Sequence, residues 1–564
     1  MMKMNVAQSV AKTLREYDTK YFFLMTGGDQ DFWYAIEEAG IQFVLARSEN
    51  AAVYMADGYA RISYKPAFVY GQFGPGAANV AAGMADPFWA CSPVVAITSS
   101  MSTRGRYTPH YQELDQTSMF NHVTKWNGYV PSPNRAAELT RNAIRFAVSG
   151  CPGPTHLDIP YDFFGLEIEV PEIYAESSCK EYPAFRCSAD TSKIVEAADF
   201  LLKAARPVIV AGSGVILSRA WDDLVRVSEL LSIPVATSLG GKGSIPEDHP
   251  LSIGVVGKYG RKSANDIVTK SDLVLFVGSK TGSLVTNDFS IPKPGTRIIH
   301  IDITPDVQGR NYKTDVSILA DAKLGLRALI DVISQKRVLR PLSNPWVDEV
   351  RTATKQWKKE FESVATKPAL PMKPQRIMKI LREILGKNDI VVADTGYMGG
   401  WTGVLFDVLS TGRTYIRATG SLGWAFPASL GAKLAAPDRN VICVSGDGGI
   451  GYHLPELETA LRLKIPVVAL VLNNKSLAFE YHDQKYLYDG KKILSGVNDF
   501  LDVDYGKVAL AFGAYGQRIE KAEELKDAIK LAIDSGKPAL IDIIVSKEEI
   551  APVTDYEHVI ERKI

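Results

Sequence analysis

Two short polar clusters in the last third of the chain, Gly446-Asp447-Gly448 and Asn473-Asn474, combine residue types that bind cations and phosphates. Each cluster follows an apolar, β-rich run (441–444 and 465–472), and a helical stretch (455–463) lies between the two runs. This order predicts a β-α-β unit. Both clusters then lie at the carboxyl ends of neighbouring parallel strands, where open α/β sheets bind ligands.

The chemistry of these side chains suits a magnesium ion. Asp447 and Asn474 offer oxygen atoms, and oxygen ligands favour Mg²⁺, which commonly bridges to phosphates. Gly448 and Gly449 lack a side chain, so their backbone can approach a diphosphate closely. A single Gly-Asp-Gly is also typical of an ordinary strand-to-helix turn. Two clusters, each closing an apolar strand, favour the magnesium–diphosphate interpretation.

The arrangement resembles the signature of thiamine-diphosphate enzymes. In that family the first Asp, the second Asn and a backbone carbonyl two residues later hold Mg²⁺. The resemblance therefore implies Asp447, Asn474 and Ser476 as metal ligands. It also implies thiamine diphosphate and Mg²⁺ as cofactors.

Glu49 belongs to a second matching motif. It begins a predicted helix with many small residues, and taken alone it is a helix-start carboxylate that the helix dipole favours. The stretch 49–61 resembles the glutamate helix of the same enzymes, whose carboxyl hydrogen-bonds a ring nitrogen of the cofactor's aminopyrimidine. That bond activates the cofactor as a carbon nucleophile. The histidine that usually precedes this glutamate is Ser48 here.

Three further stretches match cofactor-binding positions of the family. The turn at 71–79 supplies Gly76 and Asn79 at the pyrimidine end. Another match is a predicted strand end, where the backbone of Gly396 and Tyr397 is expected to face the diphosphate. Leu422 corresponds to the apolar residue that supports the bent cofactor, although by its chemistry alone a leucine is more typical of a core.

The resemblance covers nearly the whole chain and implies an α/β protein of three doubly wound parallel-sheet domains. We expect a pyrimidine-binding domain at 1–165, a central nucleotide-binding-like domain at 191–335 and a diphosphate- and Mg²⁺-binding domain at 372–548. Residues 166–190 lack periodicity and are predicted to be a linker. Residues 549–564 form a tail that is a candidate cover for the active site.

This domain order resembles the acetolactate synthase, pyruvate oxidase and 2-hydroxyacyl-CoA lyase group. In that group the two ends of the cofactor are held by different subunits. The resemblance therefore implies a homodimer or homotetramer with active sites between subunits.

Composition excludes several other classes of function. The formal net charge of 564 residues is zero, so a general affinity for nucleic acid or anionic membranes is not expected. The apolar runs are too short for a membrane span, and the chain opens as an amphipathic helix, not as a signal peptide. The five cysteines show no metal-binding spacing. We expect a cytoplasmic enzyme that acts on a small molecule.

The substrate-binding residues are inferred from the same family. Gln112 lies in a stretch that resembles the one whose glutamine reaches the reacting centre, although a solvated polar loop fits it too. Gly27, Tyr111 and Phe479 are predicted to line the substrate pocket. Glu480 is a candidate acid or base for a substrate 2-hydroxyl, and a helix-surface carboxylate is an equally good interpretation.

The substrate class follows from where the chain departs from its relatives. Acetolactate synthases typically have Met and Trp where Phe479 and Asp483 lie here, and the arginine-bearing stretch of their middle domain is missing. These departures favour a 2-hydroxyacyl-CoA lyase, which reversibly cleaves its substrate to an aldehyde or ketone plus formyl-CoA. The alternative is acetolactate synthesis from pyruvate. A flavin-containing oxidase and a non-catalytic cofactor-binding subunit are two further alternatives.

On the lyase interpretation the central domain binds ADP, and the alternatives are FAD and a domain that binds no nucleotide. The candidate residues are two turn glycines and two strand-end aspartates, each of which also suits an ordinary α/β turn: Gly212, Gly214, Asp302 and Asp321.

Overall fold

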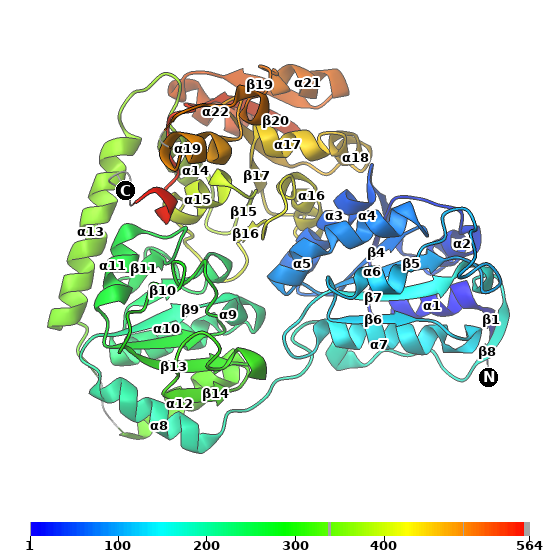
Figure 1. The fold of residues 1–564 in the computed structure, drawn as a ribbon, viewed down its shortest axis with the longest axis horizontal. Coiled ribbons are helices and arrows are strands. Elements are labelled where there is room, and N and C mark those ends of the chain that lie inside the picture. The colour runs from blue at the N-terminus through cyan, green and yellow to red at the C-terminus, as the bar shows by residue number, and fades with distance from the viewer. Residues whose placement is uncertain (1, 337–339, 489, 558–564) are drawn as a thin grey trace. The chain divides into compact units, whose positions relative to one another are not determined.

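The computed structural model describes residues 2–336, 340–488 and 490–557 (Figure 1). Three six-stranded sheets with helices around them form the molecule, which confirms the predicted fold class. The central strands of each sheet are short, mostly apolar and buried, as expected for parallel sheets that are covered on both faces. No helix in the described part of the chain is long and apolar enough to cross a membrane.

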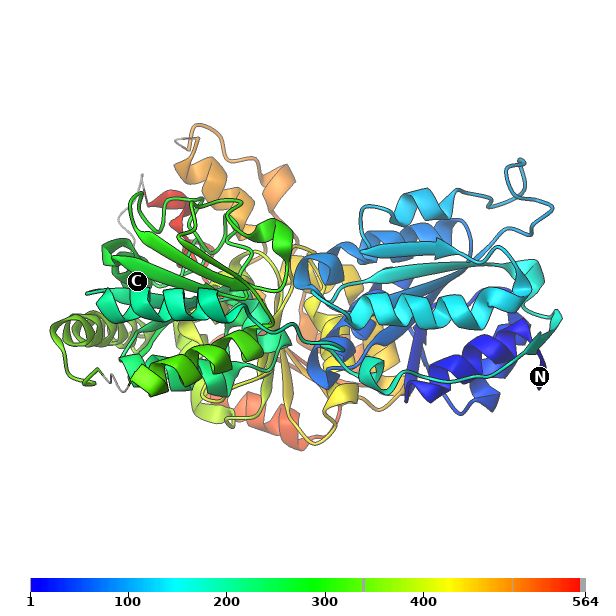
Figure 2. The same ribbon diagram turned by 90° about the horizontal axis from the view of Figure 1, so that it is seen from below.

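The first sheet has the strand order β3-β2-β4-β5-β7-β6. Figure 2 shows helix α7, drawn in cyan, lying along this sheet. The strands are β2 Tyr21–Leu24, β3 Gln42–Leu45, β4 Ala67–Gly71, β5 Val94–Ser100, β6 Trp126–Tyr129 and β7 Thr155–Pro160. The helices of this part are α1 Val6–Glu16, α2 Gln30–Glu38, α3 Glu49–Ser63, α4 Pro75–Gly83, α5 Ala85–Ala90, α6 Gln116–Phe120 and α7 Ala136–Val148.

The middle sheet has the different order β11-β10-β9-β12-β13-β14. Its strands are β9 Pro207–Ala211, β10 Val235–Thr237, β11 Ser252–Val255, β12 Leu273–Val277, β13 Arg297–Asp302 and β14 Val316–Leu319. The helices are α8 Thr191–Lys203, α9 Ser213–Leu217, α10 Trp221–Leu231, α11 Lys262–Lys270, α12 Ala322–Lys336 and the long α13 Pro345–Ala365.

The third sheet repeats the order of the first, as β16-β15-β17-β18-β20-β19. Its strands are β15 Ile390–Ala393, β16 Tyr415–Arg417, β17 Val441–Gly446, β18 Val468–Asn473, β19 Tyr515–Ile519 and β20 Ala539–Ile544. The helices are α14 Pro374–Ile384, α15 Tyr397–Leu405, α16 Ala425–Ala435, α17 Asp447–His453, α18 Glu456–Arg462, α19 Ala478–Tyr486, α20 Ser495–Asn498, α21 Tyr505–Phe512 and α22 Ala522–Asp534.

In each sheet the chain first adds strands toward one edge and then toward the other, so the strand order reverses between two neighbouring strands. Turns that contain glycine follow those two strands. In the third sheet this point lies between β15 and β17, which lead into Gly396 and Asp447. In the first sheet it lies between β2 and β4, the strands before Gly27 and the turn at 74–76. Ligands of open α/β sheets bind at such topological switch points.

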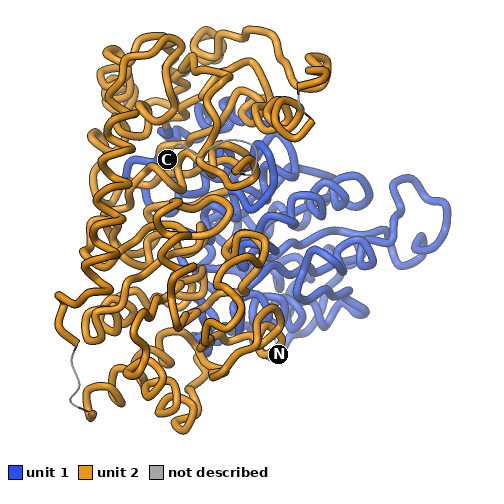
Figure 3. Tube along the Cα trace, turned by 60° about the vertical axis from the view of Figure 1, so that its left-hand side comes forward, with its two compact units in different colours: residues 1–185, 418–441, 452–467 blue, residues 186–417, 442–451, 468–564 orange. Residues whose placement is uncertain are grey.

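Contacts divide the chain into two compact units (Figure 3). Unit 1 comprises residues 1–185, 418–441 and 452–467, and unit 2 comprises the remaining segments. Helices α16 and α18 lie in the same unit as the first sheet. The limits of the three predicted domains stay predictions.

Two local predictions near the first sheet, the opening amphipathic helix and the linker at 166–190, are correct only in part, because each overlooks a short strand. The chain opens with strand β1 (Met2–Asn5), and helix α1 follows it because Asn5 and Gln8 form a capping box. The predicted linker contains strand β8 (Glu167–Val170), which pairs antiparallel with β1. Neither strand has an apolar run long enough to be recognised in the sequence. Each is stabilised by pairing with the other strand, which no local pattern records.

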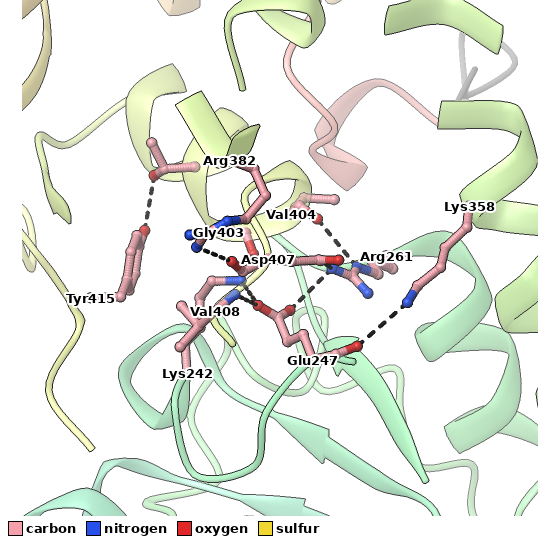
Figure 4. A network of polar contacts seen from close by, with 11 residues as sticks. Lys242, Glu247, Arg261, Lys358, Arg382, Gly403, Val404, Asp407, Val408 and Tyr415 are labelled. Carbon is pink, nitrogen blue, oxygen red and sulfur yellow. Dashed lines mark hydrogen bonds and ion pairs between the residues drawn. The ribbon is translucent and has the colours of Figure 1, made fainter. Parts of the chain in front are cut away.

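A buried charged network lies inside unit 2 (Figure 4). Lys242 forms an ion pair with Glu247, and Arg261 binds both Glu247 and Asp407 at 3.0 Å and 2.6 Å. The two cations also bond the carboxyl end of α15: Lys242 donates to the carbonyl of Gly403, and Arg261 donates to that of Val404. The network therefore fixes the loop after β10 to the helix that begins at Tyr397.

Candidate functional site

Asp447 lies at the carboxyl end of β17 with one oxygen free for a ligand. Burial raises the pKa of its carboxyl to about 6, against hydrogen bonds from the backbone N–H groups of Gly448, Asn474 and Ser476, which lower it. Its Oδ2 atom is buried and has no hydrogen-bond partner. A buried, unpartnered carboxylate oxygen is costly unless it binds something, so it fits a cation.

The structure brings the other two predicted metal ligands to the same carboxyl. The side-chain Oδ1 of Asn474 accepts a hydrogen bond from the Ser476 backbone N–H at 3.0 Å, which leaves it a second lone pair. No group of three or more His, Cys, Asp or Glu side chains suited to a metal occurs among the described residues. The predicted site is of another kind, with one carboxylate, one amide and one backbone carbonyl.

Asn473, the first residue of the asparagine pair, has a structural role that the sequence analysis missed. Its side chain donates to Asp542 Oδ1 at 3.0 Å and to the Val503 carbonyl at 3.1 Å. Burial raises the pKa of Asp542 to about 6. An aspartate inside the apolar run 539–544 was the signal that such a partner exists.

Two glycines of this site lie against neighbouring side chains, and a third has a left-handed backbone. A Cβ atom on Gly448 would lie 2.7 Å from Leu477 Cδ2, and one on Gly449 would lie 2.5 Å from Asp394 Oδ2. Gly396 has a φ of +67° and open space around the position of a Cβ. These positions keep the strand ends free of side chains, as a diphosphate would need.

Glu49 is the first residue of α3 in unit 1, and its carboxyl is oriented by two neighbours. Asn79 donates a hydrogen bond to Glu49 Oε2 at 3.0 Å. On the other side, a Cβ atom on Gly76 would lie 3.4 Å from Oε1. The turn predicted for the pyrimidine end therefore contacts the predicted catalytic carboxyl.

The strand end before Glu49 is fixed by a second buried carboxyl, which the sequence analysis missed. Glu456 accepts hydrogen bonds from the Arg47 backbone N–H at 2.9 Å and 3.2 Å. Burial raises the pKa of Glu456 to about 7, against hydrogen bonds from Thr459 and Arg47. Its place in the first turn of a helix gives no sequence signal for this partner.

Gln112 lies in a loop that packs against the same turn. Its backbone has a φ of +64°, and a Cβ atom on Gly74 would lie 2.5 Å from its carbonyl oxygen. Gln116, which was not predicted, fixes the turn: its Oε1 accepts from Gly74 N–H at 2.9 Å, and its Nε2 donates to Asp158. The neighbouring Tyr111 is 83% exposed.

Gly27 lies after β2, and a side chain does not fit there. A Cβ atom would lie 2.4 Å from Gln72 Oε1, and the Gly27 carbonyl accepts a hydrogen bond from Trp33 Nε1 at 3.0 Å. The structure thus gives Gly27 a packing role beside its predicted role in the substrate pocket.

Phe479 and Tyr397 lie together in an aromatic cluster of unit 2. Their ring centroids are 4.9 Å apart, and the Tyr397 hydroxyl is 2.6 Å from His482 Nδ1. Tyr556, from the described part of the tail, packs against Phe479 and donates to Asp483. Residues 558–564 of the tail lie outside the described residues. Glu480 is exposed in the first turn of α19.

The candidate nucleotide residues of the middle sheet have structural partners within the protein. Gly212 and Gly214 pack against Gly278, where a Cβ atom would lie 2.1 Å and 2.6 Å from it. Asp321 forms an ion pair with Arg186 at 2.8 Å. Asp302 accepts from Thr304 N–H at 2.8 Å. Their predicted role in binding a nucleotide stays a prediction.

Comparison with known proteins covers all three sheets. Models of the thiamine pyrophosphate enzymes match residues 4–119 (N-terminal TPP binding domain), 194–329 (central domain) and 394–543 (C-terminal TPP binding domain).

Curated relatives extend over nearly the full chain. A probable acetolactate synthase large subunit of Methanocaldococcus jannaschii is 34% identical over 561 residues, which are 98% of this chain and 93% of the relative. The corresponding protein of Methanococcus aeolicus is 34% identical over 96% of this chain and 92% of its own. The acetolactate synthase isozyme 3 large subunit of Escherichia coli is 28% identical over 97% of this chain and 96% of its own length.

Proposed function

Because the chain belongs to the thiamine-diphosphate-dependent enzymes of the acetolactate synthase group, we propose that it joins two 2-oxo acid molecules with loss of carbon dioxide. With pyruvate the product is acetolactate. Similarity over the whole chain to acetolactate synthase large subunits carries this proposal.

The names of these relatives favour carboligation over the 2-hydroxyacyl-CoA lyase activity that the sequence analysis preferred. That preference depended on Phe479, Asp483 and the missing arginines. In the structure Phe479 packs on Tyr397, and Asp483 accepts a hydrogen bond from Tyr556. Both residues thus have partners within the aromatic cluster, which is compatible with the carboligation proposal.

The oxygens at the end of β17 and β18 support a role in holding Mg²⁺ and the diphosphate. Asp447 offers the buried, unpartnered Oδ2, and Asn474 and Ser476 bond to the same carboxyl. Asp447, Asn474 and Ser476 would hold a divalent cation, whose charge would stabilise the charged form of Asp447 and offset the charge of the diphosphate. The glycines at 396, 448 and 449 leave the backbone open to the diphosphate.

Glu49 is the proposed proton carrier. When bound, thiamine diphosphate supplies a carbon nucleophile that attacks a substrate carbonyl. Asn79 holds Glu49 Oε2, so Oε1 faces the Gly76 side and is the atom that we assign to proton exchange with the cofactor's ring nitrogen. Gln112 is proposed to reach the substrate, and its loop is fixed against the same turn.

The test is product analysis by mass spectrometry. Purified protein with thiamine diphosphate and Mg²⁺ receives pyruvate in one tube and 2-hydroxyisobutyryl-CoA in another. We expect acetolactate from the pyruvate tube only, and its loss when a chelator removes Mg²⁺. Formyl-CoA and acetone from the second tube, without acetolactate in the first, would overturn the carboligation proposal and restore the lyase interpretation.

The same preparation tests the middle sheet and the assembly. We propose a homo-oligomer, to be checked by analytical ultracentrifugation. FAD or ADP bound at the turns after β9 and β13 would be released by heat and identified by its absorbance spectrum. A yellow flavin supports FAD, and a purine spectrum alone supports ADP.

A further inference from the structure

A buried group of charges in unit 1 ties helix α3 to the loop that carries Leu422. Asp57 and Arg61 lie on α3, and Asp86 lies on α5. Their exposed fractions are 0%, 4% and 1%. Arg61 binds Asp57 through Nε at 2.8 Å and Asp86 through Nη2 at 2.9 Å. The group holds two carboxylates and one guanidinium, so it has one negative charge in excess.

The loop supplies the donors that match this excess charge. The Asp86 carboxylate accepts from the Thr419 N–H at 3.1 Å and 2.9 Å, and from the Ser421 N–H at 3.1 Å. The Thr419 hydroxyl also donates to the Asp86 backbone carbonyl at 2.8 Å. Hydrogen bonds to a buried charge are stronger than those between neutral groups, so these contacts hold the loop firmly.

The far end of the loop is held by the same group. Trp424 is fully buried, and its Nε1 donates to Asp57 Oδ2 at 2.9 Å. The Arg61 guanidinium lies 4.5 Å from the centre of the Trp424 ring. Between the two ends, Gly423 has a φ of +85°, a conformation that favours glycine.

Leu422 lies between these two attachment points and is itself only half-buried. A segment held at Ser421 and Trp424 presents Leu422 with little freedom. The ion pairs alone leave one negative charge in excess, so the backbone donors on either side of Gly420 complete the partners of Asp86 and tie the loop to it. We propose that Asp86, together with Asp57 and Arg61, is a positioning residue for Leu422 and through it for the bound cofactor. The inference rests on the proposed role of Leu422 beneath the cofactor.

The test measures, by isothermal titration calorimetry with Mg²⁺ present, how tightly the wild type and Asp86→Asn bind each of two ligands. Thiamine diphosphate requires the support of Leu422, whereas inorganic pyrophosphate requires only the diphosphate site. An amide has one acceptor oxygen in place of two, so it cannot serve Arg61, Thr419 and Ser421 together. We expect the affinity for thiamine diphosphate to fall roughly tenfold and the affinity for pyrophosphate to stay within about twofold.

Two further variants complete the design. Trp424→Phe keeps the ring over Arg61 and removes only the Nε1 donor, so we expect a smaller selective loss of roughly threefold. If Asp86→Asn does not fold, the selective loss of thiamine diphosphate affinity in Trp424→Phe tests the proposal. Glu176→Gln is the matched control, because Glu176 also forms an ion pair in unit 1, with Arg145, but touches no part of the loop. It should leave both affinities unchanged.

Hydrogen exchange supplies a readout that does not depend on the cofactor. The amides of Thr419 and Ser421 should exchange faster in Asp86→Asn than in the wild type. An equal loss for both ligands, or no loss of thiamine diphosphate affinity, overturns the proposal. Since no substrate is used, a selective loss in a protein that makes no acetolactate would contradict the proposed reaction and still support this role of Asp86.

Discussion

At the scale of single residues, burial raises the pKa of two carboxyl groups, one at the predicted metal site and one beside the strand end that precedes Glu49. It raises the pKa of Asp447 to about 6 and that of Glu456 to about 7. Each carboxyl accepts backbone N–H groups from the end of a strand: Asp447 from the end of β18, and Glu456, on helix α18, from Arg47 after β3. Asp447 also has a free oxygen, which suits a cation, whereas Glu456 has Thr459 and Arg47 as partners, which suits a structural role.

We predict that Glu456→Gln stabilises the protein at alkaline pH. The pKa of Glu456 is higher in the folded state, at about 7, than its ordinary value of 4.5, so its contribution to stability is lost as the pH rises from 4.5 through 7. Glutamine stays neutral and can accept from Arg47 and donate to Thr459. By thermal unfolding, the variant should gain about 3 kcal/mol relative to the wild type between pH 5 and pH 8. An equal effect at both pH values would show that the Glu456 charge plays no part.

At the scale of elements, the contact between α3 and α16 decides where Glu49 lies. The two helices approach so closely that a Cβ atom on Gly58 would lie 2.0 Å from the Ala428 carbonyl oxygen, and one on Gly431 would lie 1.8 Å from that of Met55. Backbone lies on both sides, so neither contact can be relieved by rotating a side chain.

Gly58→Ala should therefore be destabilising, by about 1–3 kcal/mol, because the helices must separate. Chemical denaturation measures the change. The control is Gly451→Ala on helix α17, where no atom lies within 4 Å of the new Cβ, so helix propensity should make it neutral or slightly stabilising. If the two variants lose equal stability, the close approach of α3 and α16 is not responsible.

Among the elements, some strands could be predicted from the sequence. The strands before Asp447 and Asn474 were predictable because uninterrupted apolar runs end in glycine or asparagine there. The partners of these residues were not. Gln116 and Asp86 bond residues far along the chain, at Gly74 and Thr419, and no local pattern records such contacts. The short strands β1 and β8 were missed for the same reason.

At the scale of the whole molecule, the first and third sheets share one strand order and the middle sheet has another. Within unit 2, the link between the loop after β10 and the end of α15 is the charged network of Figure 4. Lys242 is fully buried, and burial lowers its pKa while Glu247 raises it. The network holds two cations and two anions in Lys242, Arg261, Glu247 and Asp407.

Lys242→Met should cost about 3–5 kcal/mol of unfolding free energy, because it leaves Glu247 and Asp407 to share Arg261 and the buried network with one negative charge in excess. The double variant Lys242→Met/Glu247→Gln restores neutrality and should recover part of the loss. Denaturant unfolding of both variants measures the difference. A double variant less stable than the single one would mean that shape, not charge balance, dominates this network.

The central claim is that Glu49 activates thiamine diphosphate for carbon–carbon bond formation. The most direct measurement follows ¹³C-labelled pyruvate by NMR with the wild type and Glu49→Gln, each saturated with thiamine diphosphate and Mg²⁺. Calorimetry first confirms that both bind the cofactor. We predict labelled acetolactate and carbon dioxide from the wild type, and a rate lower by roughly 10²–10⁴-fold in the variant. Wild-type turnover by Glu49→Gln would contradict the claim.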